Sequence, residues 1–453
     1  MKLTKKSDRL GTQAIVPLLF KLSIPSIIAM AIQALYNVVD SIYVGHISTD
    51  ALSALSLTFP LQIIIIGIAV GTGIGTSSLI SRLLGMGNKK RACNAAEHVI
   101  VIAIIYGIII ALVGLLYSQN LLKFFTEDTK LINIGTEYIR IIFTGSIALF
   151  FPMISNNILR GEGNTVAPMI TMLIGSILNI ILDPFFIFGI WFFPEWGVAG
   201  AAFATVLSRI ISGVFLIYIL FSDKNEIKLN MRSFEFDFSI VKSIFKVGFP
   251  AMVMQFLASF MLAGMNKILI SYSSTAIAAA GIYFRLQSFV FMPVFGLNQG
   301  YMPIVGYNYG HNKPERVKKV IKSAFLIAIG FTTTGFLLFQ LIPTQLITMF
   351  NNDPELIRIG TRALKVISLA FPIIGPAIII STTFQALGKG LPSLLLSFLR
   401  QIIILLPLMY FLGKTTSLNY LWYAFPISEL TSMIPGAFWL RITLKNTFKR
   451  MNS

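Results

Sequence analysis

The chain has 453 residues, of which 55% are hydrophobic and only 12% charged, and 36 Lys and Arg residues against 18 Asp and Glu residues give it a net charge of +18. Soluble domains carry about 25% charged residues, so this composition excludes a water-soluble globular enzyme. The basic residues occur in short clusters between apolar segments and form no continuous stripe, which argues against a nucleic-acid partner.

Apolar segments follow one another along the whole chain, each bounded by Gly, Pro, Asn or charged residues. A helix needs about 20 residues to cross the hydrocarbon core of a membrane. We therefore predict about twelve transmembrane helices, at residues 15–45, 51–83, 93–117, 132–158, 166–190, 197–222, 240–271, 276–305, 317–342, 357–386, 392–412 and 419–443. The first fifteen residues are basic and polar, so no removable signal peptide is expected.

Lysine and arginine residues are concentrated in the even-numbered connections between these helices and at the two termini. The odd-numbered connections contain few, of which Lys123, Lys130 and Lys414 are the clear cases. By the positive-inside rule, both termini are expected to be cytoplasmic. The sequence thus predicts a multi-pass protein of a bacterial cytoplasmic (inner) membrane, with the lipid bilayer as its surroundings.

The two halves of the chain repeat each other at a shift of 225 residues. This shift aligns Phe20, Lys21, Pro25, Gly71, Gly75, Gly85 and Arg91 with Phe245, Lys246, Pro250, Gly296, Gly300, Gly310 and Arg316. Six helices per half is an even number, so both halves begin on the same side of the membrane. The predicted fold class is an all-α polytopic membrane protein with an N-lobe at 1–222, a cytoplasmic linker at 223–239 and a C-lobe at 240–453. Two such lobes can enclose a central cavity and rock against each other.

Acidic residues inside the apolar segments are the first candidates for function, because an ionisable group is costly in a membrane. Asp40 and Asp183 fall at a similar depth to Thr205, roughly 8 to 12 Å below the outer boundary at the rise of an α-helix. Tyr36 precedes Asp40 by four residues and Asn179 precedes Asp183 by four, so each pair lies on one helix face. These five residues can therefore share one site in the N-lobe.

The internal repeat supplies a comparison for the two carboxylates. Asp40 aligns with Met265, and Asp183-Pro184 lies opposite Leu406-Pro407, so the carboxylates exist in one lobe only. Two carboxylates at one depth cannot both ionise cheaply, which favours binding of a proton between them. Asn179 and Thr205 add neutral oxygens, so Asp40, Asn179, Asp183 and Thr205 are also a candidate Na⁺ site. We expect H⁺ and/or Na⁺ as the coupling ion and no cofactor.

Two further charged residues lie in predicted helices. For Glu429, a buried ion pair with Arg400 or Arg285 is the simplest explanation. Arg209 follows Thr205 by one helical turn and either pairs with an acid or faces water in the cavity.

Methionine and phenylalanine residues form stripes on the first two helices of the C-lobe. The members are Met254, Met261 and Met265, and Phe284, Phe291 and Phe295. Ordinary packing explains such stripes, but thioether and aromatic surfaces also suit lipophilic cations of varied shape. Together with Arg209, these six residues are the candidate lining of a substrate cavity for drugs or toxic organic cations.

Several motifs resemble the multidrug and toxic compound extrusion (MATE) family over nearly the whole chain, most closely the bacterial MepA-like group of the DinF branch. They are GTGIGTSSLISRLLGMGNKKR from Gly71, GLNQGYMPIVGYNYG from Gly296, LRGEGN from Leu159, NIILDPFFIFG from Asn179 and AGAAFATVLS from Ala199. The resemblance implies a cation-coupled drug antiporter, not an enzyme. It implies a coupling site in the N-lobe at Asp40, Tyr138, Asn179, Asp183 and Thr205. A C-lobe cation site is not expected, because Ala258 occupies the relevant region of the seventh helix.

Two other functions are alternatives to multidrug efflux. A lipid-linked oligosaccharide flippase of similar architecture is expected to line its cavity with many cationic residues that hold a pyrophosphate. Few cationic residues lie at that depth here, and Arg209 is the chief exception. An intramembrane aspartyl protease also uses two membrane-buried aspartates as acid and base. Its GxGD motif is absent from the chain, and proteolysis needs no full-length repeat.

Overall fold

The computed structural model describes residues 7–191, 193–223 and 225–452, and these residues fold into helices without any strand. The N-terminal half contains α1 (Asp8–Thr12), α2 (Ile15–Ile47), α3 (Thr49–Gly85), α4 (Lys89–Lys123), α5 (Thr129–Thr144), α6 (Ser146–Gly161), α7 (Val166–Phe188) and α8 (Gly197–Leu220). The C-terminal half contains α9 (Phe238–Leu269), α10 (Ser274–Gly310), α11 (Pro314–Leu341), α12 (Pro343–Thr348), α13 (Pro354–Ile367), α14 (Phe371–Ala386), α15 (Gly390–Phe398), α16 (Leu406–Thr415), α17 (Leu418–Leu421) and α18 (Ala424–Asn452). The predicted all-helical membrane fold is confirmed.

Ten of the helical spans in the described part of the chain are long and apolar enough to cross a membrane, and α5 with α6 makes an eleventh that is bent by 52°. Helix α18 has 29 residues, which corresponds to about 44 Å and is long enough for a twelfth span, although its sequence is more polar. The predicted segment 357–386 is interrupted by a 3-10 turn at Ser368–Ala370. The predicted segment 392–412 contains a π-helix at Leu399–Leu405, which ends two residues before Pro407. The ring nitrogen of Pro407 cannot donate to the Ile403 carbonyl.

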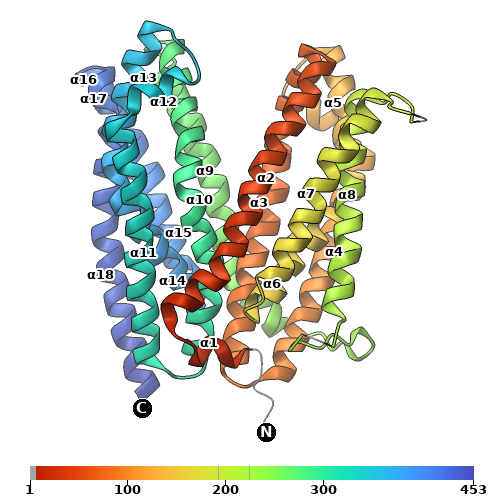
Figure 1. Ribbon diagram of the computed structural model, residues 1–453, viewed down its shortest axis with the longest axis vertical. Helices are drawn as coiled ribbons and strands as arrows, with labels where there is room; N and C mark the ends of the chain where they lie inside the picture. Colours follow the sequence, from red (N-terminus) through yellow and green to blue (C-terminus); the bar gives the residue numbers. More distant parts are fainter. Residues whose placement is uncertain (1–6, 192, 224, 453) are drawn as a thin grey trace.

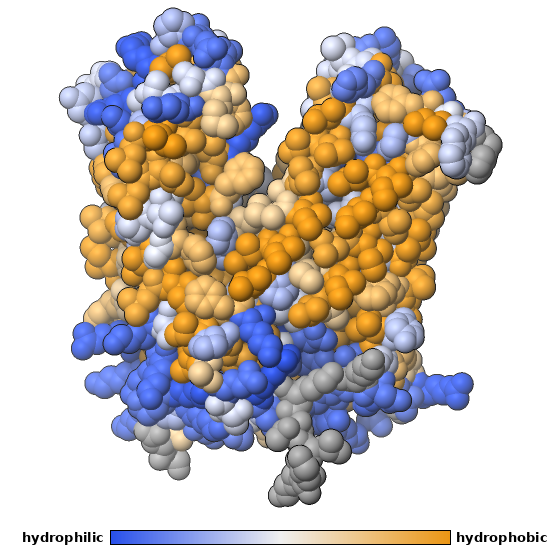
Figure 2. Space-filling view, in the orientation of Figure 1, coloured by the Kyte–Doolittle hydropathy of each residue, from blue (hydrophilic) through white to orange (hydrophobic). Residues whose placement is uncertain are grey.

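The helices form two lobes that converge at one end and spread apart at the other (Figure 1). Helix α1 and the last turn of α18 lie at the convergent end, which we call the terminal end; the opposite end is the far end. Figure 2 shows a wedge-shaped hollow between the lobes at the far end, apolar side chains over the middle of both lobes, and hydrophilic side chains gathered at the terminal end. The molecule is therefore closed at the terminal end and open at the far end.

Glycines allow the two lobes to touch backbone to backbone near the terminal end. A Cβ atom at Gly85 of α3 would overlap the carbonyl oxygen of Tyr307 in α10, and a Cβ atom at Gly310 of α10 would overlap the carbonyl oxygen of Arg82 in α3. Both pairs are related by the 225-residue shift. Each lobe thus meets the other through the same pair of positions.

The same reciprocity extends up the interface. A Cβ atom at Gly71 of α3 would overlap Met252 of α9, whereas one at Gly296 of α10 would overlap Ile27 of α2, and these pairs are again 225 residues apart. We call the contact made by Gly71, Gly85, Gly296 and Gly310 the inter-lobe seam. It is a close-packed surface in which a single added methyl group has no room.

The connection between the lobes is bound to the N-lobe through its backbone. Glu162 Oε2 accepts hydrogen bonds from the backbone N–H groups of Glu226 (3.1 Å) and Ile227 (3.2 Å). Glu97 Oε1 accepts one from Asn230 N–H (2.9 Å). At the end of the connection, His98 Nε2 accepts from the backbone N–H of Asp237 at 2.8 Å.

Asp237 also caps the first helix of the C-lobe. Its Oδ1 accepts from the backbone N–H of Ser239 at 2.8 Å, directly before the first turn of α9. Side-chain and backbone hydrogen bonds from Ser239 hold the pKa of Asp237 below its usual range, so this cap is charged at neutral pH.

The predicted orientation can be tested with single cysteines, after replacing the one native cysteine, Cys93, by serine. Ser48 lies exposed between α2 and α3 at the far end, and Asn312 lies exposed between α10 and α11 at the terminal end. Ser48→Cys is expected to react with a membrane-impermeant maleimide added outside intact cells, and Asn312→Cys only after the cells are opened. Reaction of both cysteines from one side contradicts the helix count.

Candidate functional site

The polar side chains predicted for the N-lobe come together in one buried cluster. The carboxyl groups of Asp40 in α2 and Asp183 in α7 lie close enough to interact with each other. Asp183 is 0% exposed, whereas Asp40 is only partly buried. The two carboxyl groups therefore meet in a site where one side is closed by protein and the other retains some access.

Asn179 links the carboxylates to a neighbouring helix. Its Nδ2 donates to Asp183 Oδ1 at 3.1 Å, one turn along α7, and to Thr205 Oγ1 of α8 at 3.3 Å. Two acceptor oxygens at this point, Asn179 Oδ1 and Asp183 Oδ2, are buried without a hydrogen-bond partner in the described part of the protein. Buried acceptors are normally satisfied, so these two oxygens are available to a proton or a cation.

Two tyrosines and an arginine complete the surroundings. The hydroxyl group of Tyr36 interacts with the Thr205 side chain, and the guanidinium carbon of Arg209 lies 6.0 Å from the centre of the Tyr36 ring. Tyr138 of α5 is buried with its hydroxyl group near Asp40. All six residues proposed for cation coupling thus lie in one cluster built from α2, α5, α7 and α8.

One member of this cluster was not predicted. Gln62 of α3 interacts with the Tyr138 hydroxyl group and donates from Nε2 to Thr58 Oγ1 at 3.2 Å. Its position two residues after Pro60, within an otherwise apolar run, is the signal that could have identified it.

The local sequence explains how Asp183 is held. Pro184 lies inside α7 and has no backbone N–H, so the Ile180 carbonyl lacks its usual helical donor beside the carboxylate. Gly189 ends the helix in the left-handed conformation, with φ of 66°. Helix α7 therefore presents its polar residues directly before a point where the helix is weakened.

The cluster has the chemistry of a site for a light cation. Among residues 7–191, 193–223 and 225–452, no group of three or more His, Cys, Asp or Glu side chains is placed to hold a metal ion. Two carboxylates with an amide and a hydroxyl oxygen instead offer hard oxygen ligands, which suit Na⁺ as well as a hydrogen-bonded proton.

The Met and Phe stripes of the C-lobe are divided by the structure. Met265 and Phe291 are 1% and 4% exposed and belong to the C-lobe core, where the Phe291 ring lies 5.1 Å from that of Phe371. Met261 and Phe284 pack against the same core. Neighbouring helices therefore cover both Met265 and Phe291.

Three remaining candidates have different surroundings. Met254 is partly exposed and Phe295 is 45% exposed, so both retain accessible surface. Arg209 lies in the N-lobe beside Tyr36, so it belongs with the carboxylate cluster and not with the Met and Phe stripes.

The ion pair predicted for Glu429 is confirmed. Arg400 Nη1 donates to Glu429 Oε1 at 3.0 Å and to Oε2 at 3.2 Å. Arg400 lies in the π-helix Leu399–Leu405, and both charged groups are largely buried. This pair accounts for the one acidic residue inside the last helix.

Two lobes related by an internal repeat, open to one side and carrying a buried polar cluster in one lobe, have the architecture of an alternating-access membrane transporter. The family model MatE matches residues 25–185 and 250–411, segments that begin 225 residues apart. The chain belongs to the MatE family, which confirms the resemblance found in its motifs.

Curated relatives share about a quarter of their residues with this chain over most of their length. The probable multidrug resistance protein NorM of Thermotoga maritima is 29% identical over 404 residues, which are 89% of this chain and 87% of that protein. The multidrug export protein MepA of Staphylococcus aureus is 28% identical over 411 residues, 90% of this chain and 89% of that protein. The FAD transporter of Shewanella oneidensis is 26% identical over 414 residues, 91% of each. These relatives are transporters, so the prediction that the chain is not an enzyme is confirmed.

Solved structures agree in fold. The crystal structure of MATE in the bent conformation matches with a TM-score of 0.93 and 28% identity, covering 100% of both chains. The outward-facing conformation of a multidrug resistance MATE family transporter matches with a TM-score of 0.92 and 28% identity, covering 99% of this chain and 100% of that one.

Proposed function

We infer that this protein is a secondary multidrug exporter that moves lipophilic, often cationic compounds outward in exchange for H⁺ or Na⁺. The names of the NorM and MepA relatives support multidrug efflux and a contribution to antibiotic resistance. The observation that carries ion coupling is the interaction between the Asp40 and Asp183 carboxyl groups, with unpartnered oxygens on Asn179 and Asp183 beside it.

The proposed location is the bacterial cytoplasmic membrane, with both termini in the cytoplasm. The hydrophilic terminal end is rich in Lys and Arg, which supports this orientation. In this orientation the wedge between the lobes opens outward (Figure 2).

The carboxylate cluster can couple ion binding to movement of the lobes. When one carboxyl group carries a proton, the two groups share a hydrogen bond and only one negative charge is buried. When the proton leaves, two like charges face each other in a site of low dielectric constant, which is unfavourable. The resulting strain acts on α7 next to Pro184, where a helical hydrogen bond is already absent.

Transport by purified protein in liposomes tests the proposal. Ethidium, a lipophilic cation, is loaded inside, and a pH gradient or a Na⁺ gradient is imposed separately. We expect efflux of ethidium that is driven by at least one of these gradients and abolished when both are absent. FAD serves as an anionic comparison, because a relative is an FAD transporter. Transport of FAD without gradient-driven transport of any lipophilic cation contradicts multidrug efflux.

The Met and Phe stripes give a second test, because their members lie in different surroundings. Phe291→Ala is expected to cost about 3–5 kcal/mol of stability, since it removes a buried core ring, and so to lower the yield and melting temperature. Met254→Ala is expected to leave the yield unchanged and to alter the order of preference among cationic substrates. If Met254→Ala has no effect on that order, Met254 does not line the substrate cavity.

A further inference from the structure

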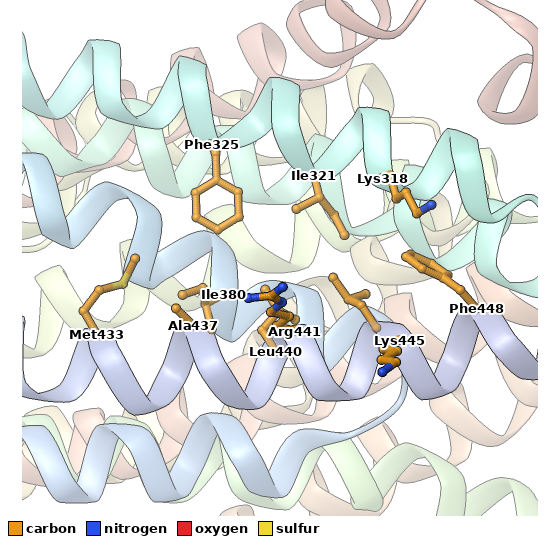
Figure 3. A pocket seen from close by; sticks show the side chains of 11 residues that line it. Lys318, Ile321, Phe325, Ile380, Met433, Ala437, Leu440, Arg441, Lys445 and Phe448 are labelled. Carbon is orange, nitrogen blue, oxygen red and sulfur yellow. The ribbon is translucent and has the colours of Figure 1, made fainter.

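A groove with a volume of about 650 Å³ lies on the outside of the C-lobe, between α11 and α18, away from the carboxylate cluster. Figure 3 shows α11 and α18 running alongside each other, with Ile380 of α14 behind them. The apolar part of its wall is formed by Ile321, Phe325, Ile380, Met433, Leu440 and Leu444. The groove is thus long, apolar and bounded by three helices.

The groove faces the surface of the protein that contacts lipid. The same two helices carry exposed apolar side chains beside it, with Leu326 62%, Phe438 66% and Ile442 42% exposed. Apolar exposure on this scale, on helices of a membrane protein, is expected where acyl chains surround it. A hydrocarbon chain is therefore the molecule available to fill the apolar wall.

Cations gather toward one end of this apolar groove. Lys318, Arg441 and Lys445 line it, and none of its lining residues is acidic. Figure 3 places Lys318, Lys445 and Phe448 together at one end and Phe325 and Met433 at the other. That basic end is the one nearer the termini, since Lys318 lies four residues after the start of α11.

Two of these cations have no counter-charge among the residues that the structure describes. Lys318 Nζ is paired with Glu315 at 2.6 Å and lies 5.3 Å from the centre of the Phe448 ring. Arg441 and Lys445 have no ion-pair or hydrogen-bond partner among the described residues. Arg441 also lies eleven residues before the end of α18, about 16 Å along the helix, between the exposed apolar residues Phe438 and Ile442. An unpaired guanidinium group at such a position is costly unless an anion meets it there.

We propose that this groove binds one anionic phospholipid from the leaflet on the side of the termini. Arg441 and Lys445 hold the phosphate, and an acyl chain lies along Phe325 and Leu440. A phospholipid combines the two features that the groove requires, a negative headgroup at the basic end and a hydrocarbon chain along the apolar wall. The groove shares no lining residue with the carboxylate cluster, and the proposal does not depend on the proposed transport function.

Native mass spectrometry of the delipidated full-length protein tests this proposal. The probes are dioleoyl phosphatidylglycerol, which is anionic, and dioleoyl phosphatidylcholine, which has the same chains and no net charge. We expect the anionic lipid to bind roughly thirtyfold more tightly, since each of the two basic residues near the bilayer surface contributes a factor of about five. Arg441→Gln with Lys445→Gln is expected to remove this preference.

Matched variants separate the site from general charge and from misfolding. Lys319 and Lys322 are exposed on α11 and do not line the groove, so Lys319→Gln with Lys322→Gln is expected to keep the preference. Arg441→Lys with Lys445→Arg keeps the charge and is expected to keep it as well. Equal binding of the two lipids, or an unchanged preference in the Arg441→Gln, Lys445→Gln variant, overturns the proposal. Complete displacement of the lipid by millimolar inorganic phosphate also overturns it, because the site would then bind phosphate alone.

Discussion

Asparagine at both Asp40 and Asp183 is expected to reduce gradient-driven efflux to the level of liposomes without protein. Each asparagine keeps the shape of the side chain and resembles the neutral carboxyl group, so the cluster can no longer gain or lose a proton. In the unmodified protein, Asn179 Nδ2 donates to Asp183 Oδ1 at 3.1 Å. The Asp183→Asn variant keeps an oxygen that can accept this hydrogen bond. Folding should therefore change little, by roughly 1 kcal/mol or less. Ethidium efflux under a pH or Na⁺ gradient, together with the melting temperature, measures both effects.

Asp50→Asn is the matched control for this experiment. It makes the same chemical change at a surface carboxylate, which pairs with Lys130 at 2.5 Å outside the cluster. Surface ion pairs contribute little to stability, so transport and melting temperature should both remain close to those of the unmodified protein. Full gradient-driven transport by the double variant would falsify a coupling role and leave Asp40 and Asp183 as structural groups.

Alanine at both Gly85 and Gly310 is expected to open the inter-lobe seam and to stop transport. A methyl group at either position meets a backbone carbonyl of the opposite lobe, which cannot move aside as a side chain can. Overpacking of this kind costs about 1–3 kcal/mol per site. Each 1.4 kcal/mol by which the closed conformation is destabilised lowers its population relative to the open conformation about tenfold. The conformation that is closed at the terminal end should therefore become the minor one.

A buried cysteine can report this opening. Ser81 of α3 is 0% exposed and lies at the seam beside Gly306, so Ser81→Cys, with Cys93 replaced by serine, should react slowly with a maleimide. The Gly85→Ala, Gly310→Ala variant should raise that reaction rate. Gly330→Ala is the control, since nothing lies within 4 Å of a Cβ atom at Gly330 in α11. An unreactive cysteine in the double variant, with transport intact, contradicts the seam as the point of closure.

Hydropathy and the repeat predicted most helix positions within a few residues. They missed the interruptions inside the predicted spans at Gly145, Ser368 and Leu399, because the residues next to each break are mostly apolar on both sides. Apolarity reports contact with lipid or core, and it does not report whether the backbone continues straight.

The carboxylate cluster was predictable because helical rise converts residue number into depth. Asp40, Asp183 and Thr205 share a depth, and four-residue spacing adds Tyr36 and Asn179. The burial of Phe291 was not predictable in this way, because a stripe on one helix does not specify which helix covers it. The repeat likewise aligned Gly85 with Gly310 but could not show that each meets the opposite lobe.

The linker between the lobes has a mechanical consequence. Between the end of α8 and the start of α9, its backbone is anchored to N-lobe side chains, and the last anchor, from His98, is on Asp237, the residue directly before α9. Little free chain is left to absorb relative motion. We therefore expect the start of α9 to stay at a fixed distance from the N-lobe when the lobes move. The C-lobe can then rotate about this point, but it cannot separate from the N-lobe there. Lengthening the linker upstream of His98's anchor should leave that pivot in place.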